Sequence, residues 1–139
     1  MKIRIHVEKE PVCDIVLLDD KAPNLCRQLV SALPLSGRIT HAKLSGPVIF
    51  FTLPFVAPWE NYMLFEEVPR HRQGNTSRGA VCINNAAQHF CVAYADDVVP
   101  EPLGMSYIGD VVDGLERLEN IGIRSWLHQG YRIELSLAR

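Results

Sequence analysis

The stretch IVLLDDKAPNLCRQLVSALP, residues 15–34, decides the fold that the sequence predicts. It opens with an apolar run typical of a buried strand and continues in a helical pattern, with Leu25 and Leu29 four residues apart on one apolar face. Asp19 and Asp20 precede this helix, at the end where a capping side chain and negative charge are favourable. The stretch therefore predicts a strand followed by one amphipathic helix.

Strand patterns surround this helix on both sides. Residues 2–8 and 131–138 alternate apolar and polar side chains, as half-buried strands do. Shorter strand patterns lie at residues 13–18, 38–44, 47–53, 80–85, 89–95 and 106–112, with a further one near 62–68. A second helical pattern starts at residue 113, and residues 70–79 read as a polar surface loop. About eight strands without strand–helix alternation favour a mainly β, mostly antiparallel closed barrel, formed by one domain over residues 1–139.

Composition excludes several classes of protein. The chain has 139 residues, a net charge of −2 and 47% hydrophobic residues, which is ordinary for a globular domain and argues against nucleic-acid binding. No apolar run reaches the ~20 residues of a membrane-spanning helix. The four cysteines lack Cys-x-x-Cys spacing and no signal peptide is visible, so we expect reduced thiols and a cytoplasmic protein. Neither a metal-ligand spacing nor a glycine-rich phosphate loop is present, so we expect no metal and no cofactor.

Three segments resemble cyclophilins. Residues 15–33 are similar to the second strand and first helix of that family. YIGDVVDGLERLENIG, residues 107–122, is similar to its run of strand, Val-Val, acidic residue, glycine and helix, and VCINNAAQHFCVAY, residues 81–94, resembles its central strand pair. The resemblance implies a cyclophilin-like β-barrel whose two open ends are each covered by a helix.

The pattern resembles still more closely a bacterial family with a cyclophilin-like fold and no established activity. ALPLSGRITHAKLSGPVIFF, residues 32–51, and the pair Glu60-Asn61 are similar to recurrent stretches of that family. This resemblance covers nearly the whole chain, and it implies a fold without an activity that can be transferred.

Cyclophilins are peptidyl-prolyl isomerases, and few of their site residues have counterparts here. Their His-Arg pair corresponds to His41-Ala42, so the arginine that donates to the prolyl nitrogen is missing. Phe90 resembles the aromatic residue that lines the proline pocket, but the pocket Trp and His correspond to positions near Glu101 and Met105. A divergent isomerase or peptide-binding module is therefore an alternative rather than the leading function.

The leading hypothesis is a small-molecule binding or catalytic pocket at the barrel mouth. His41 is its first catalytic candidate, because imidazole titrates near neutral pH, and Glu60 is the second, with Asn61 as a substrate-orienting amide. Each has a structural alternative: His41 as a core histidine, and Glu60 and Asn61 as loop residues bonded to backbone. The catalytic hypothesis requires His41 and Glu60 to meet at one cavity, where proton transfer or hydrolysis would occur.

Aromatic side chains would line the walls of the same pocket. Trp59, Phe90 and Tyr94 are the substrate-binding candidates, although aromatic residues in strands more often belong to the core. A third hypothesis is a non-catalytic scaffold that self-associates. The expected partners are thus a small-molecule ligand or a second copy of the chain, and neither nucleic acid nor a membrane.

Overall fold

The computed structural model describes residues 1–138, and their secondary structure is mainly β. The strands are β1 (Lys2–Val7), β2 (Glu10–Leu17), β3 (Leu35–Arg38), β4 (Thr40–His41), β5 (Val48–Thr52), β6 (Tyr62–Leu64), β7 (Ala80–Asn84), β8 (His89–Ala93), β9 (Gly104–Asp113) and β10 (Arg132–Leu137). The helices are α1 (Pro23–Ala32), α2 (Leu115–Leu127) and the 3-10 helix η1 (Phe65–His71).

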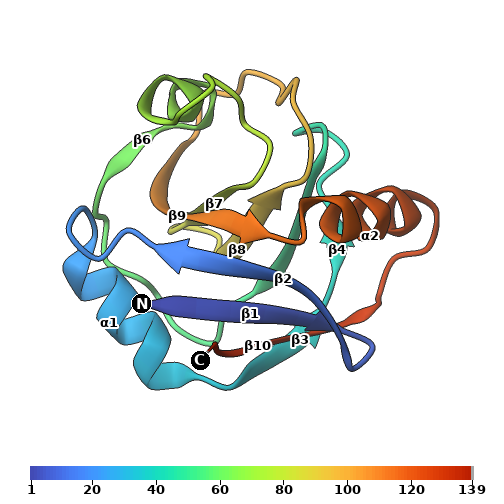
Figure 1. The fold of residues 1–139 in the computed structure, drawn as a ribbon. Helices are drawn as coiled ribbons and strands as arrows, with labels where there is room; N and C mark the ends of the chain where they lie inside the picture. The colour runs from blue at the N-terminus through green and yellow to red at the C-terminus, as the bar shows by residue number, and fades with distance from the viewer. Residues whose placement is uncertain (139) are drawn as a thin grey trace.

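The strands form a nearly closed antiparallel barrel (Figure 1). Their order in the wall is β3-β10-β1-β2-β9-β7-β8-β5-β4, and β6 adds to β9 outside this path. The two ends of the path, β3 and β4, are separated in the chain by Ile39 alone, so the sheet returns on itself. This arrangement confirms the predicted mainly β barrel, and it leaves few strand edges unpaired.

The interior of the barrel is a packed apolar core rather than a cavity. Alternate residues of the wall strands point inward, among them Ile3 of β1 and Phe90 of β8, both 0% exposed. Leu25 of α1 and Leu118 of α2 are also fully buried against this core. The two helices lie at opposite ends of the barrel, so each apolar stripe covers one open end (Figure 1).

A second apolar cluster lies on the outer face of β7, β8 and β9. Cys82 and Tyr107 alternate with the inward-pointing residues of their strands, and Phe65 and Val68 of η1 pack over them. The short strand predicted near residues 62–68 is therefore only half right, because β6 ends at Leu64 and η1 follows. The helix forms there because Phe65 and Val68 meet an apolar surface that no local pattern shows.

The segment after η1 is ordered by one buried side chain. Arg72 donates from Nη1 to the carbonyl oxygens of Thr76 and Arg78. Asp96 accepts hydrogen bonds from the Thr76 hydroxyl and, at 3.1 Å, from the backbone N–H of Ser77. The polar loop predicted at residues 70–79 is thus ordered from within by Arg72, and it is attached to the rest of the fold through Asp96 and through the bond from Arg72 to Asp110 of β9.

The start of α1 differs from the expectation. Ala22 occupies the N-cap position and has no side-chain cap, and Asp19 instead binds the N-terminal amino group at 2.5 Å. The cap comes from Glu60, far away in sequence.

Among residues 1–138, all four cysteines are free and buried, and no helix is long and apolar enough to cross a membrane.

Candidate functional site

His41 lies in β4 beneath α2 and is only 4% exposed. Its Nε2 is 2.6 Å from the Tyr94 hydroxyl, and its backbone N–H donates to the Gln129 side chain at 2.9 Å. The Trp126 ring meets the imidazole edge-on, with 4.4 Å between ring centroids. Burial, and secondarily the charge of Lys43, lowers the pKa of His41, so the ring is neutral at pH 7. The ring nitrogen that faces Tyr94 is already engaged in this bond.

Helix α2 closes the barrel end above this pair. A Cβ added at Gly122 would lie 2.3 Å from the Tyr94 ring, so only glycine lets the helix come this close. Tyr94 is 5% exposed as a result, and the other His41 nitrogen, Nδ1, is buried without a partner within residues 1–138. The structure brings His41 and Tyr94 together, but in a sealed contact.

Glu60 is engaged at the other end of the barrel. Its Oε1 accepts from the backbone N–H of Leu25 at 2.6 Å, and its Oε2 accepts from Asn24 Nδ2 at 2.9 Å. Both bonds are made in the first turn of α1, so Glu60 acts as the helix cap that the local sequence lacks. Because α1 and α2 lie at opposite ends, the structure does not bring Glu60 and His41 to one cavity (Figure 1).

The remaining predicted site residues separate into three environments. Phe90 is 0% exposed and packs on Phe51 inside the barrel, with 5.5 Å between ring centroids. Trp59 is 54% exposed on the surface. Asn61 has a left-handed backbone, with φ of 47°, and its Nδ2 donates to the carbonyl oxygen of Tyr107 at 2.8 Å. Asn61 therefore ties its loop to β9, next to the cavity described below.

A cavity of about 500 Å³ lies against the outer face of β9, and we call it the β9 cavity. It is lined by three residues before α1, three at the end of η1, one loop asparagine and two residues of β9: Leu18, Asp20, Lys21, His71, Arg72, Gln73, Asn61, Tyr107 and Asp110. It lies outside the barrel wall, whereas the sequence led us to expect a pocket at the barrel mouth.

Asp110 is the best-defined polar group of the β9 cavity. Its Oδ1 accepts from Arg72 Nε at 2.7 Å and from the Tyr107 hydroxyl at 2.6 Å. The Arg72 side chain is 9% exposed and that of Asp110 is 31% exposed. Burial, and then the bond to Asp110, raises the pKa of Tyr107, so the phenol stays protonated and remains a donor. Asp110 Oδ2 receives no hydrogen bond from any of the described residues, which leaves one oxygen of a fixed carboxylate for a ligand.

Sequence reasoning missed Arg72, Tyr107 and Asp110. Arg72 stood in a segment that reads as a surface loop, and Tyr107 in a strand that reads as core. The one available signal was Asp110 itself, a charged residue within the apolar strand YIGDVV.

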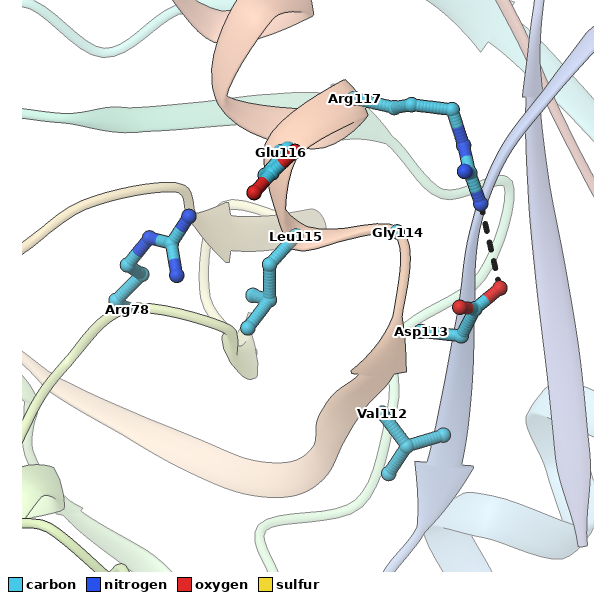
Figure 2. Close-up of a pocket in the computed structure, with 7 residues that line it drawn as sticks. All are labelled: Arg78, Val112, Asp113, Gly114, Leu115, Glu116 and Arg117. Carbon is cyan, nitrogen blue, oxygen red and sulfur yellow. Dashed lines mark hydrogen bonds and ion pairs between the residues drawn. The ribbon is translucent and has the colours of Figure 1, made fainter.

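A hollow of about 420 Å³ lies where β9 turns into α2, and Figure 2 shows the residues that line it. Arg117 reaches back to Asp113, with 3.2 Å between Nη2 and Oδ2, and Arg78 pairs with Glu119 at 3.4 Å. Gly114 has φ of 88°, and a Cβ there would lie 2.1 Å from a carbonyl oxygen of β2. Both arginines of this hollow are already paired, so we assign it to the strand–helix junction rather than to a ligand.

No three His, Cys, Asp or Glu side chains among residues 1–138 lie close enough together to hold a metal ion.

No curated protein matches the chain. Among the solved structures that share its fold are McbB and the hypothetical protein AF2241. McbB, solved in complex with tryptophan, superposes with a TM-score of 0.79 at 18% identity, over 96% of this chain and 44% of McbB. The solution structure of the hypothetical protein AF2241 from Archaeoglobus fulgidus gives a TM-score of 0.71 at 21% identity, over 99% of this chain and 95% of AF2241.

The chain thus spans less than half the length of McbB, and likeness at these identities shows the fold alone. Residues 5–89 match a family model described as "Protein of unknown function (DUF3830)". Because this match covers more than half of the sequence, the chain belongs to the DUF3830 family.

Proposed function

We propose that this protein is a cyclophilin-like domain that binds a small amino-acid-like molecule in the β9 cavity. The observation that carries the proposal is the Asp110 carboxylate. Arg72 and Tyr107 hold one of its oxygens, at 2.7 and 2.6 Å, and the other oxygen has no partner in the described part of the chain. Such a carboxylate is preorganised to accept a hydrogen bond without first losing an internal one.

The cavity walls suggest a ligand that carries both signs of charge. Oδ2 of Asp110 would accept from an ammonium or hydroxyl group, while Lys21 and His71 supply donors for a carboxylate. The volume of about 500 Å³ lies within the usual range of small-molecule sites, roughly 300–1,000 Å³. A free amino acid or a related zwitterion fits these requirements in both charge and size.

McbB gives independent support for this ligand class. Its structure was solved in complex with tryptophan, so a protein that contains a barrel of this fold binds an amino acid. McbB is more than twice as long as the region that matches, and its ligand enters our proposal only as an indication of class.

The alternatives lack a comparable observation. An isomerase or peptide binder would need Phe90 at an open groove, and Phe90 is buried in the barrel core. A catalytic pair of His41 and Glu60 stays a prediction, because His41 contacts Trp126 of α2 and Glu60 contacts the first turn of α1. The scaffold hypothesis rests on exposed apolar residues such as Leu44 and Leu127, and nothing indicates which partner would cover them.

We also propose a cytoplasmic location, which the four free cysteines support.

Titration calorimetry of the full chain with the proteinogenic amino acids tests the proposal. At least one should bind, and Asp110→Asn should weaken that binding about tenfold or more, because it replaces a charge-assisted hydrogen bond with a neutral one. Asp14→Asn is the matched control, since Asp14 is a strand aspartate whose Oδ1 also accepts from an arginine Nε, that of Arg4, at 2.7 Å. Binding by no amino acid, or equal binding by wild type and Asp110→Asn, would contradict the proposal.

A further inference from the structure

We propose a second ligand site, for a small phosphate monoester, on the outer face of β1 and β10. A pocket of about 330 Å³ there is lined by His6, Lys9, Arg132 and Glu134, and we call it the β1–β10 pocket. It is distinct from the β9 cavity, because β2 lies between β1 and β9 in the barrel wall. The proposal does not depend on the function of the β9 cavity.

The strand register gathers these side chains on one face. His6 of β1 lies opposite Glu134 of β10, and Arg132 precedes Glu134 by two residues, so all three point outward from the barrel. On the neighbouring β3, Arg38 lies opposite Arg132 but outside the lining of the pocket, and its Nη1 donates to the carbonyl oxygen of Gly130. Lys9 reaches the same pocket from the turn between β1 and β2.

The positive charges of the pocket have no internal partners. Within residues 1–138, five ion pairs are formed, and none of them includes Lys9, Arg132 or Glu134. The hollow in Figure 2 shows the contrast, since Arg117 there binds Asp113. Unpaired donors around one concave surface are what an anion requires.

The turn that presents Lys9 is strained. Glu8 and Lys9 are the two central residues of the β1–β2 hairpin, with φ of 49° and 72°. Both values are positive, as in the turn that Asn-Gly normally occupies, and each is costly for a residue with a side chain. Glu8 uses its Oε2 to accept from the backbone N–H of Arg132 at 3.3 Å, which leaves Lys9 facing the pocket. Of the two unfavourable residues, Lys9 lines the pocket and Glu8 ties the turn to the backbone of β10.

The donor set favours phosphate over a single carboxylate. A guanidinium, an ammonium and an imidazole together offer donors in several directions, which suits a group with three terminal oxygens. Glu134 is the one carboxylate of the pocket, and it would accept from a hydroxyl group of the esterified alcohol. The expected ligand is therefore a small hydroxylated alcohol that carries one phosphate.

The test is an amide NMR titration of the full chain with glycerol 1-phosphate, inorganic phosphate and succinate at constant ionic strength. Glycerol 1-phosphate should give saturable shifts at Lys9 and Arg132, and both Arg132→Gln and Lys9→Ala should weaken its binding about tenfold. Inorganic phosphate should bind more weakly than the ester, and Glu134→Gln should remove that difference. Arg117→Gln, at the paired hollow of Figure 2, is the control and should bind like wild type.

A variant of the turn separates binding from folding. Replacing Glu8-Lys9 by Asn-Gly should raise the unfolding temperature, because it relieves the strained turn, and should still weaken glycerol 1-phosphate binding. Succinate binding as tight as the ester, shifts that do not saturate, or shifts that persist in Arg132→Gln would overturn the proposal.

Discussion

Two buried tyrosines of this barrel each form a short hydrogen bond with a titratable side chain, but one pair is sealed from solvent and the other borders a cavity. Tyr94 lies 2.6 Å from His41 Nε2, and Tyr107 lies 2.6 Å from Asp110 Oδ1. The first pair is sealed beneath α2, whereas the second borders the β9 cavity. A short hydrogen bond between a phenol and a titratable group therefore does not mark a site by itself. What marks one is an unpaired atom that a ligand can reach.

The difference arises from what covers each pair. Above Tyr94, Gly122 lets the helix backbone approach the ring closely and excludes any opening. Beside Tyr107, η1 ends at His71, and the hydrogen bond from Arg72 to the Thr76 carbonyl oxygen fixes the path of the chain that follows. This path leaves room for the cavity. The barrel end under α2 is thus closed over Tyr94, whereas the outer face of β9 is open beside Tyr107.

Gly122→Ala should have the largest effect, because it forces α2 away from the sealed pair. The new methyl group would lie 2.3 Å from the Tyr94 ring, and overpacking of this kind typically costs 1–3 kcal/mol. We expect a loss of about 3 kcal/mol in the free energy of unfolding by urea denaturation, although alanine favours helix. Asn120→Ala, at an exposed position of the same helix, should change stability by less than about 0.5 kcal/mol. Equal stability of the two variants would show that α2 does not seal this end.

Removing each tyrosine hydroxyl compares the two pairs directly. Tyr94→Phe leaves both ring nitrogens of buried His41 without a partner and should cost about 2 kcal/mol. Tyr107→Phe should cost only about 1 kcal/mol, because Asp110 keeps its bond to Arg72 and remains partly exposed. Chemical denaturation measures both values, and a larger loss for Tyr107→Phe would reverse our account of which pair is structural.

Glu60→Ala tests whether the residue predicted as the catalytic partner of His41 is a helix cap. It removes two bonds to the first turn of α1 and should cost about 1 kcal/mol. Asp20→Ala removes one of the two aspartates that the local sequence offered as a cap, and its effect should stay below about 0.5 kcal/mol. Thermal unfolding of the two variants decides which residue caps α1. A larger loss of stability for Asp20→Ala than for Glu60→Ala would show that the local aspartate is the cap.

Protonation of His41 should contribute to the loss of folding stability at low pH. Its pKa is lowered in the folded state, so the unfolded chain binds the proton more readily. The stability due to neutral His41 is therefore present above the unfolded value of 6.5 and is lost as pH falls through the folded pKa. Wild type should lose more stability than His41→Gln between pH 7.5 and pH 5, as urea midpoints will report. Parallel pH profiles would mean that His41 is accessible to solvent.

The sequence predicted the barrel because period-two alternation and the leucine spacing of α1 are local patterns that follow from burial. It did not predict the β9 cavity, because Arg72 and Asp110 are separated by 38 residues and meet only when η1 packs on β9. Glu60 shows the same limit, since it caps a helix that lies 35 residues earlier. Periodicity tells which face of an element is buried, and it carries no information on the distant partner of a polar side chain.

The measurement that tests the central claim most directly is an amide NMR titration of the full chain with the tightest-binding amino acid from the calorimetric series. We predict saturable shifts around Asn61, Tyr107 and Asp110, and none around His41 and Tyr94. Shifts concentrated at His41 and Tyr94 would show that the sealed pair is the site, and they would contradict our account.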